Sequence, residues 1–526
     1  MLITEILARN ARMYGQETAL VEREPGKHRR VEISWNTLDD QANAIAQALI
    51  ARGVKKGDRV VHLMMNGILW LPAYFGILRT GAWAVPLNFR FVAKTIAKCT
   101  RTAEAKAFIF GEAFIDRVTE IRAEIENCVQ TFIFEGPKDK CPAWAEPLDR
   151  LIAGHPAEDP GVAIDICDDA ALYFTSGTTG TPKAARLTHR NLEHACYVEN
   201  RHHHQTHTDN FLCIPPLYHT GAKMHWFGNF IVGAKAVILK GIEPRWILDA
   251  ISEEKITIVW LLVPWAMDLL LAIKSGELKL KNYRLDQWRL MHIGAQPVPA
   301  SLIKEWRTVF PNHQYDTNYG LTESTGPGCI HLGIENMHKV GAIGSPGFDW
   351  ECRIVDDQFH PVAQGNPGEL IIKGPGVMKE YYKNPQATAA AIVNGWLLTG
   401  DVARQDEEGF IWLVDRKKDV IITGGENIYP VEIEDFLMNH PKIQDVGVIG
   451  LPSLRLGEIT TAIIKVKNGC DLTCAEVDDF CIALPRYKRP RKIIFGDVPR
   501  NPTGKIEKPR LRRQYAGQAE SFKAVR

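Results

Sequence analysis

A short loop in the first half of the chain combines hydroxyl groups, glycines and one lysine. It contains Thr175, Ser176, Gly177, Thr178, Thr179 and Gly180, and it ends at Lys183. Glycines let successive backbone N–H groups point inward, while the hydroxyls and the lysine add donors and positive charge for phosphate oxygens. The common phosphate loop has a different spacing, because Pro182 stands where that motif has its second glycine. Taken alone, the segment fits a nucleotide-phosphate loop and an exposed Gly/Thr turn equally well.

Four further segments accompany this loop. They are Tyr319-Gly320-Leu321-Thr322-Glu323, Thr399-Gly400-Asp401, Asp415-Arg416-Lys417-Lys418-Asp419 followed by Gly424-Gly425-Glu426-Asn427, and Pro502-Thr503-Gly504-Lys505. In this order the five segments resemble the signature of the adenylate-forming superfamily, which includes acyl-CoA synthetases, aryl-CoA ligases, peptide-synthetase adenylation domains and firefly luciferase. The resemblance covers nearly the whole chain. Ala184-Ala185 departs from the Gly-Val that the family more often has there, a change we expect the backbone to tolerate unless it needs positive φ.

The resemblance implies that ATP activates a carboxylic acid. Coupling the acid to AMP gives a mixed anhydride, which must be kept away from water. In the family, the lysine that matches Lys505 bridges the carboxylate and the α-phosphate. Glu323 and Thr178 match the positions expected to hold Mg²⁺, and Thr322 matches a hydroxyl that reaches the α-phosphate. ATP and Mg²⁺ are therefore expected here, although the basic neighbours of Lys505 also fit an ordinary surface lysine.

The base and the ribose have their own candidates. Tyr319 offers an aromatic face for adenine beside Gly320, and Asp401 with Arg416 matches the pair that holds the ribose hydroxyls in the family. The segment that resembles the other wall of the adenine site is Gly294, Ala295, Gln296 and Pro297. Without the resemblance, Tyr319 is more typical of a core position and Glu323 of a carboxylate at a helix start.

The second step of the reaction needs a thiol acceptor. Gly424, Gly425 and Glu426 match the loop that, in acyl-CoA synthetases, replaces Lys505 and shapes the pantetheine tunnel after the C-terminal domain rotates. Its glycines permit close backbone approach. Lys418 matches the hinge of that rotation, although this charged stretch also fits a solvated turn. CoA is accordingly expected as a co-substrate.

The acyl pocket is expected beside the segment from Pro215 to Gly221. This segment resembles the one in which an aromatic residue or a histidine gates the carboxylate end of the acid, so His219 is the candidate gate and a third catalytic residue. Bulky apolar residues favour a hydrophobic acid, and the pocket candidates are Trp226, Phe227 and Trp265, with Lys223 fitting either a second polar group of the substrate or a solvent-exposed lysine. Such aromatic residues are also typical of a plain core.

A group of histidines at positions 202–204 and 207 looks like a metal cluster. The surrounding Gln, Thr and Asp residues predict a polar loop, and nothing in the expected mechanism needs a transition metal. Structural or surface roles are therefore expected for these histidines.

Apolar periodicity predicts the elements that carry these groups. Helical spacing, as in Ile33–Arg52, alternates with short apolar strands such as Arg59–Met64, which predicts an α/β fold with a parallel sheet. The apolar run Ile256–Ile273 contains Pro264 and Asp268. It predicts a strand, a turn and a helix rather than a membrane span, because a central Asp would cost about 2.5–3.5 kcal/mol on insertion.

The pattern changes after Trp350. Short strands such as Gly368–Lys373, separated by Gly, Pro and Asp turns, predict a small β-rich subdomain at about 345–417. Beyond Asp415 a second α/β pattern begins, with a predicted helix at Pro430–Asn439. A chain of 526 residues is long enough for at least two domains. We predict a large N-terminal ATP- and acyl-binding domain at 1–417 and a small mobile α/β C-terminal domain at 418–526.

Composition limits the partners. A net charge of +1 and a pI near 7.6 provide no overall field for nucleic acid or an anionic membrane, so no nucleic-acid partner is expected. Eleven scattered cysteines fit a reducing cytosol, and Glu5 and Arg9 interrupt any leader-like pattern at the N-terminus. A cytoplasmic protein is expected, with peripheral membrane contact and a homodimer left open.

These observations predict an ATP-dependent acid–CoA ligase whose substrate is a medium- or long-chain fatty acid. The alternatives are a ligase for a benzoate-like or alicyclic acid, and an adenylation enzyme that loads a carrier protein. A nucleotide-binding regulator without catalysis is the alternative from a different class. The presence of Lys505, Glu323 and Asp401 argues against that last alternative.

Overall fold

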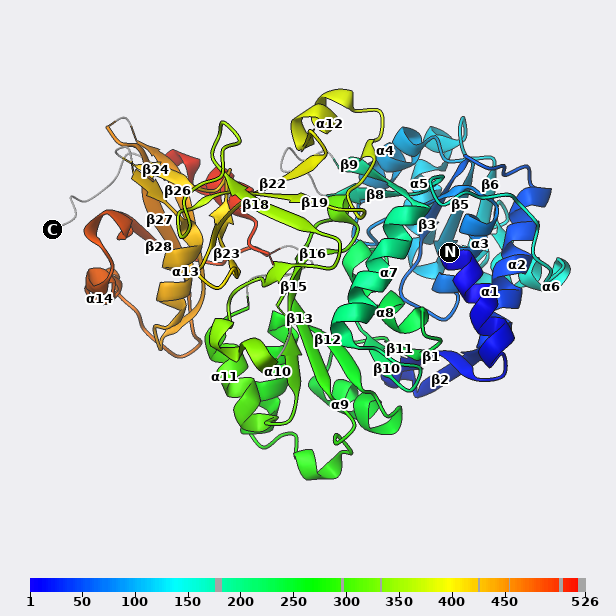
Figure 1. Ribbon diagram of the computed structural model, residues 1–526, viewed down its shortest axis with the longest axis horizontal. Helices are drawn as coiled ribbons and strands as arrows, with labels where there is room; N and C mark the ends of the chain where they lie inside the picture. Colours follow the sequence, from blue (N-terminus) through cyan, green and yellow to red (C-terminus); the bar gives the residue numbers. More distant parts are fainter. Residues whose placement is uncertain are drawn as a thin grey trace.

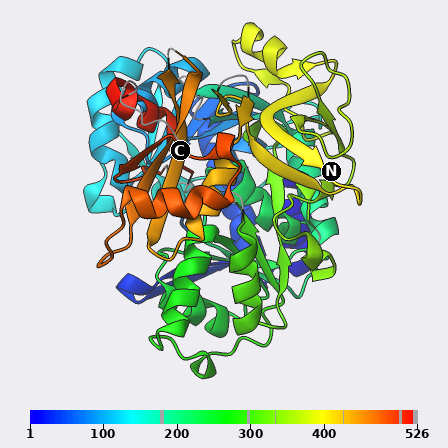
Figure 2. The same cartoon turned by 90° about the vertical axis from the view of Figure 1, so that its left-hand side faces the viewer.

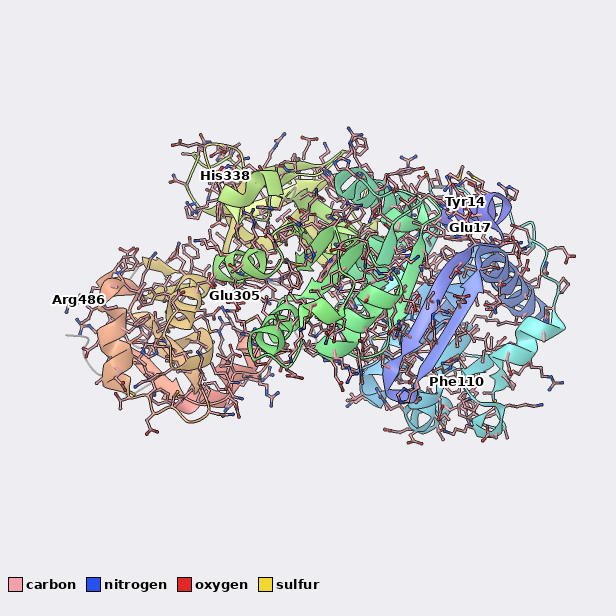
Figure 3. All side chains as sticks on the ribbon, turned by 90° about the horizontal axis from the view of Figure 1, so that it is seen from below. Tyr14, Glu17, Phe110, Glu305, His338 and Arg486 are labelled. Atoms are coloured by element: carbon pink, nitrogen blue, oxygen red, sulfur yellow. The ribbon has the colours of Figure 1, made fainter. Side chains whose placement is uncertain are left out.

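A computed structural model describes residues 1–175, 182–294, 298–331, 334–423, 426–453, 455–500 and 505–518. Two large sheets and a smaller β region form the N-terminal part, and a separate sheet with its helices lies at the opposite end of the molecule (Figure 1). Figure 3 places Arg486 at one end of the long axis and Phe110 toward the other.

The two large sheets are mainly parallel. The first has the order β20 (Glu380–Tyr381), β9 (Lys183–Thr188), β8 (Asp169–Thr175), β4 (Trp83–Pro86), β3 (Arg59–Leu63), β5 (Ala107–Gly111), β6 (Thr131–Glu135) and β7 (Glu146–Pro147). The second has the order β14 (Gln314–Asp316), β13 (Leu290–Gly294), β12 (Ile258–Leu262), β10 (Asn210–Cys213), β11 (Lys235–Leu239), β1 (Thr18–Glu24) and β2 (Arg29–Ser34).

Helices fill three layers around these sheets. The central layer contains α2 (Trp35–Ala51), α3 (Trp70–Arg79), α7 (His189–His203) and α8 (Thr220–Phe230). Helices α4 (Ala93–Ala103) and α5 (Ile115–Ile125) cover the outer face of the first sheet, and α9 (Pro244–Glu253), α10 (Val263–Lys274) and α11 (Ala300–Val309) cover the outer face of the second. The remaining N-terminal helices are α1 (Ile3–Tyr14) and α6 (Leu148–Gly154).

Alternation along the strands explains this layering. On β3, Val60 belongs to the central core and Val61 to the outer core of the first sheet. On β12, Ile258 and Val259 divide in the same way between the central core and the outer core of the second sheet. Successive strand side chains point to opposite faces, so a strand buried on both sides supplies two cores at once.

The β-rich region follows the second sheet. It contains a three-stranded sheet of β15 (Asn318–Gly320), β16 (Pro327–Ile330) and β17 (Ser345–Pro346). A second sheet has the order β18 (Glu351–Val355), β19 (Gly368–Lys373), β22 (Trp396–Gln405) and β21 (Ile392–Val393), with β23 (Ile411–Arg416) paired to β22 and helix α12 (Pro385–Ala391) preceding β21.

The C-terminal part has its own sheet and cores. Its strands are β25 (Glu426–Ile428), β24 (Ile421–Thr423), β27 (Gly457–Val466), β26 (Ile443–Ser453) and β28 (Lys492–Phe495). Its helices are α13 (Pro430–Met438), α14 (Cys474–Phe480) and α15 (Lys508–Tyr515). The C-terminal part faces the viewer in Figure 2. Two separate apolar clusters surround its sheet.

The predicted fold class is confirmed: a large α/β part with a β subdomain precedes a small C-terminal part. The run Ile256–Ile273 forms strand β12 and helix α10, as predicted, but the helix follows the strand directly, without the predicted turn between them. The predicted boundary between 417 and 418 stays a prediction. Sheet membership changes between Arg416, the last residue of β23, and Ile421, the first residue of β24. Among the described residues, no helix is both long enough and apolar enough to cross a bilayer.

Candidate nucleotide and acyl site

The ribose candidates meet on neighbouring strands. Asp401 on β22 lies opposite Arg416 on β23, and the Arg416 Nε lies 2.8 Å from Asp401 Oδ1. The Tyr319 hydroxyl, which comes from a different sheet, donates to Asp401 Oδ2 at 2.6 Å. Gly400 adopts a φ of 69°, a left-handed conformation that favours glycine. The turn thus directs a fixed carboxylate to a position where two partners already hold it.

Tyr319 is held more deeply than an exposed stacking platform would be. Only 7% of its surface is exposed, and burial together with the Asp401 charge raises its pKa well above the usual value. The neighbouring Gly320 permits close backbone packing, because an added Cβ would lie 2.4 Å from the Gly326 carbonyl oxygen. Gly294 ends β13 in the second large sheet. The roles of these residues toward adenine stay predictions.

The candidate magnesium carboxylate contacts a residue that the sequence did not single out. Glu323 lies in a short 3-10 turn, Thr322–Ser324, and its Oε1 accepts a hydrogen bond from the Tyr381 hydroxyl at 2.7 Å. Lys183 lies over the ring of Tyr381, with its Nζ 4.8 Å from the ring centroid. Tyr381 therefore joins the end of the phosphate segment to the carboxylate.

No sequence motif marks Tyr381, because its position depends on pairing between two strands that lie far apart in the sequence. Strand β20 pairs with β9, which places Tyr381 opposite Ala185. Strand β9 in turn pairs with β8, so that Thr175 lies opposite Lys183. The two ends of the phosphate loop are thus held side by side. Ser176, Gly177, Thr178, Thr179 and Gly180 lie outside the described residues, as do Ala295, Gln296, Pro297, Gly424 and Gly425.

Lys505 reaches this site from the C-terminal part. Its side chain retains solvent exposure, yet it lies close enough to the nucleotide candidates for their charges to act on it. Desolvation by the surrounding protein lowers its pKa to about 8, and the nearby positive charge of Arg416 adds to this effect, whereas Asp401 and Glu323 oppose it. The structure therefore brings together Lys505, Arg416, Asp401 and Glu323, which lie far apart in the sequence.

The connector between the two parts is anchored on both sides of the predicted hinge. Lys417 donates its backbone N–H to the Gly400 carbonyl at 2.9 Å, and its Nζ pairs with Glu369 at 2.9 Å. On the other side, Arg512 of α15 pairs with Asp419 at 2.9 Å. Lys418 lies between these two anchored neighbours. Glu426, the described member of the predicted CoA loop, begins β25 and is exposed.

His219 lies at the start of helix α8, on the side of the site where the acid is expected. It is the residue before the first turn of the helix, and its ring lies 4.2 Å from that of Tyr218. Burial lowers its pKa to about 4, and the positive charges of Lys505, Lys223 and Arg90 contribute. His219 is therefore neutral near pH 7. The influence of Lys505 places the candidate gate and the candidate catalytic lysine in the same region.

Lys223 follows one turn later and is fully buried, which excludes the solvent-exposed alternative. Its Nζ donates to the Tyr173 hydroxyl and lies 4.5 Å from the Tyr173 ring centroid and 4.6 Å from that of Tyr74. Trp70 completes an aromatic cage at 5.7 Å. Burial lowers the Lys223 pKa well below its usual value. Within the part of the chain that the structure describes, no carboxylate lies within ion-pair distance of it.

The other acyl-pocket candidates separate into two places. Trp226 and Phe227 are buried in the central core, where they pack against Phe230. Trp265 is half-buried and packs against the outer core of the second sheet, on the opposite face from α8. The structure thus does not bring these three aromatic residues together, and their role in a pocket stays a prediction.

The histidine group differs from its expected setting. Residues 202 and 203 end helix α7 rather than lying in a loop, and His203 is buried beside Asp316. His207 is partly exposed and contacts Glu17 at 3.0 Å. The run is therefore not a cluster by itself, because the helix turns its members to different sides.

Comparison with known proteins identifies the family. A family model described as AMP-binding enzyme matches residues 7–382, which is more than half of the chain, and one described as AMP-binding enzyme C-terminal domain matches residues 432–505. A long-chain-fatty-acid–CoA ligase of Mycobacterium tuberculosis is 31% identical over 92% of this chain and 94% of its own. A feruloyl-CoA synthase of Amycolatopsis is 30% identical over 96% and 98%.

A solved structure agrees with these matches. The o-succinylbenzoate coenzyme A synthetase of Bacillus subtilis, in complex with ATP and magnesium ion, superposes with a TM-score of 0.82 at 27% identity, covering 96% of this chain and 99% of that one. These matches cover most of this chain and most of each relative. The chain belongs to the adenylate-forming superfamily of AMP-binding enzymes and, within it, to the AMP-forming acid–CoA ligases.

Proposed function

We propose that this enzyme joins a carboxylic acid to CoA in two steps. In the first, a carboxylate oxygen attacks the α-phosphorus of ATP, a P–O bond forms, and pyrophosphate leaves to give acyl-AMP. In the second, the CoA sulfur attacks the acyl carbon, the thiol proton is lost, and AMP departs with the former carboxylate oxygen. The observation that carries the proposal is the approach of Lys505 from the C-terminal part to Asp401, Arg416 and Glu323.

The described residues fit distinct tasks in the first step. Asp401, already oriented by Arg416 and Tyr319, has the carboxylate that suits two ribose hydroxyls. Lys505 supplies a mobile cation between the α-phosphate and the acid, where two anions would otherwise repel one another. His219 is neutral near pH 7, so it can line the pocket at the carboxylate end of the acid without competing with Lys505 as a second cation.

The carboxylate of Glu323 fits Mg²⁺, because it offers hard oxygen donors beside the phosphate segment. When bound, Mg²⁺ neutralises charge on the phosphates and orients them. Tyr381 would hold Glu323 in place through its hydroxyl. CoA is the proposed acceptor in the second step, with the loop around Glu426 as its candidate approach and Lys418 as the candidate hinge.

For the substrate, we propose a medium- or long-chain fatty acid. The similarity to the mycobacterial long-chain-fatty-acid–CoA ligase supports this choice. A benzoate-like or other aromatic acid is the second candidate, because the feruloyl-CoA synthase is almost equally similar. Carrier-protein loading remains the alternative acceptor chemistry.

The test is release of AMP and pyrophosphate from ATP across a panel of acids from acetate through C16 fatty acids to benzoate and cyclohexanecarboxylate, each with and without CoA. We expect CoA-dependent turnover with an optimum among the C8–C16 acids. An optimum at benzoate would replace the fatty-acid proposal and keep the ligase. ATP binding without turnover of any acid, with CoA or with a phosphopantetheine carrier, would contradict catalysis and favour the nucleotide-binding regulator.

A further inference from the structure

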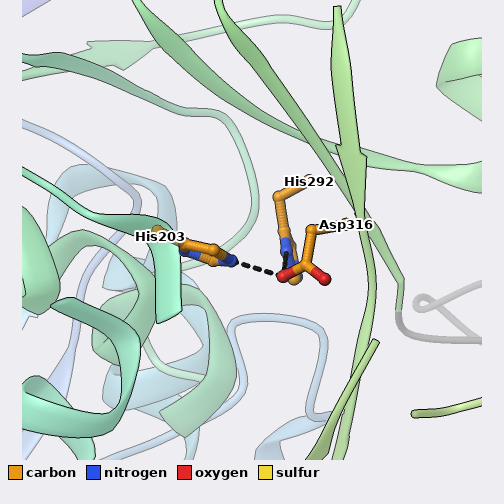
Figure 4. Close-up of side chains that lie close together, drawn as sticks. All are labelled: His203, His292 and Asp316. Atoms are coloured by element: carbon orange, nitrogen blue, oxygen red, sulfur yellow. Dashed lines mark hydrogen bonds and ion pairs between the residues drawn. The ribbon is translucent and has the colours of Figure 1, made fainter. Parts of the chain in front are cut away.

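Three buried side chains from separate elements meet in the N-terminal part of the molecule. His203 ends helix α7, His292 lies on β13, and Asp316 ends β14. All three are almost completely buried, and Figure 4 shows both imidazoles directed at the carboxylate. We call these three residues the His–His–Asp cluster.

The distances within the cluster are those of a compact donor set. His203 Nε2 lies 2.6 Å from Asp316 Oδ2, and His292 Nδ1 lies 3.6 Å from the same oxygen. One ligand atom from each residue can be chosen so that all three lie within 4.8 Å of one another. Ligands at about 2.0–2.1 Å from a tetrahedral zinc ion lie about 3.3 Å apart, so small side-chain shifts would place an ion between them.

A second observation points to a missing ligand. Neither ring nitrogen of His292 makes a hydrogen bond of normal length among the described residues, although the side chain is 1% exposed: Nδ1 faces Asp316 at 3.6 Å, and Nε2 has no such contact. A buried polar group without a partner costs free energy, so an isolated imidazole here needs an explanation. An ion between His292 and Asp316 would satisfy it.

Glu199 on α7 offers a further ligand atom for a metal ion. It is fully buried, and its Oε2 faces His203 Nδ1 at 3.3 Å, with neither atom in hydrogen-bond geometry. Its other oxygen accepts a hydrogen bond from Asn318 at 3.0 Å, which orients the carboxylate. Since Asn318 precedes Tyr319, this contact connects the cluster with the strand that carries the adenine candidate.

We propose that His203, His292 and Asp316 form a buried site for one divalent transition-metal ion of the zinc class, with Glu199 as the candidate fourth ligand. Two imidazoles with one or two carboxylates suit zinc and its neighbours better than Mg²⁺, which prefers oxygen ligands. The site would join the end of α7 to β13 and β14. A structural role follows, because these strands lead to Gly294 and Tyr319 in the nucleotide site.

The competing explanation is a metal-free hydrogen-bonded network in which a protonated His203 bridges the two carboxylates. It accounts for the short His203–Asp316 contact but leaves His292 with only the longer 3.6 Å contact to Asp316. Only the first explanation requires a bound metal ion, so elemental analysis distinguishes the two.

The first experiment uses the full-length protein without a histidine tag. It is dialysed against a metal-buffered zinc solution, passed through gel filtration and analysed by inductively coupled plasma mass spectrometry. About one zinc per chain is expected, and reconstitution with Co²⁺ should give the visible d–d absorption of a four-coordinate site. Less than a tenth of an equivalent of zinc, with no such Co²⁺ spectrum, would overturn the proposal.

The second experiment compares two variants of buried histidines. His292→Asn should retain less than a fifth of the parental zinc, and a chelator should no longer lower its thermal midpoint. His189→Asn is the matched control, since His189 is also fully buried with both ring nitrogens unpartnered but lies outside the cluster. It should retain one zinc. Equal zinc in both variants would contradict the assignment, and the Co²⁺ spectrum of the parent decides the matter if either variant fails to fold. Neither readout depends on ligase activity.

Discussion

Asp401 and Lys223 are both buried charged groups near the proposed reaction, but the protein compensates them differently. Asp401 has an arginine at 2.8 Å and a tyrosine hydroxyl at 2.6 Å. Lys223 has one hydroxyl, three aromatic rings and, in the described ranges, no carboxylate partner. The Asp401 carboxylate is therefore held in place by two partners, as its proposed role in ribose binding requires, whereas Lys223 retains a large desolvation cost.

The difference separates two kinds of site. On the nucleotide side, the ligand is fixed by the reaction, so the residue types and their local spacing can be recognised. On the acyl side, the surroundings of Lys223 come from α3, β8 and α8, and no local spacing describes them. The following four predictions test the contrast, beginning with the largest effect.

Replacing Lys505 with alanine should remove the cation from the adenylation step. Loss of one such electrostatic group typically costs about 10²–10³-fold in rate. Pyrophosphate release from ATP and acid should fall by at least about 100-fold, while thioester formation from supplied acyl-AMP and CoA should stay within a few-fold. Arg513→Ala, which removes an exposed cation from the same C-terminal region, is the control. An equal loss in both half-reactions would contradict separate conformations for the two steps.

Replacing Asp401 with alanine should impair both half-reactions together. Each lost hydrogen bond to a charged group costs about 1.5–3 kcal/mol, or about 10–150-fold, and the change also leaves Arg416 and Tyr319 without their partner. Rates of adenylation and of thioester formation should be measured separately under the same conditions. If thioester formation is unchanged, Asp401 does not hold the ribose throughout the reaction.

Adenylation should weaken at alkaline pH because Lys505 must be protonated. Its pKa of about 8 means that the cation is present below this pH and is lost above it. The kcat/KM for ATP should therefore fall about tenfold per pH unit once the pH is well above 8. Lys505→Arg should remove this limb below pH 10, since arginine stays charged. A limb that persists in the variant would belong to another group.

Replacing Lys223 with methionine should stabilise the folded protein. Burying a polar group costs about 1–3 kcal/mol in mutational data, and a methionine of similar size avoids this cost. The direction of the pH dependence follows from the lowered pKa of Lys223. Because the unfolded state binds the Lys223 proton more readily than the folded state, the free energy of unfolding of the wild type increases as the pH rises toward about 10.4.

The advantage of Lys223→Met should accordingly be largest near neutral pH and shrink at higher pH. Thermal unfolding at several pH values measures it. A less stable variant would show that the cage compensates the cation. A loss of activity toward one acid without a loss of stability would favour a role for Lys223 in recognising the substrate.

Local patterns predicted much of the fold, and the motifs that resemble the family named residues that lie together in the structure. Gly368–Lys373 forms the strand expected from its sequence, and helix α13 begins at the predicted Pro430. The meeting of Asp401, Arg416 and Tyr319 agrees with the roles expected for them, although those roles await the experiments above.

Contacts between distant strands could not be predicted in this way. Tyr381 reaches Glu323 because β20 joins an edge of the first sheet, and His292 reaches His203 because β13 lies beside the end of α7. Neither contact leaves a spacing in the chain. The histidine run likewise does not reveal the buried position of His203, since only the helix shows which of its members turns inward.

The anchored connector limits how the two parts can move. Lys417 is bound to the N-terminal part by its backbone and its side chain, and Asp419 is bound to α15 of the C-terminal part. Asp419 and Val420 also donate their backbone N–H groups to the Arg416 carbonyl, at 2.8 and 3.1 Å. If both anchors persist, a rotation between the parts must be taken up by the backbone torsions of residues 417–419, and it must strain or break these two hydrogen bonds. The range of the motion would then be set by a few backbone torsions rather than by the length of a linker.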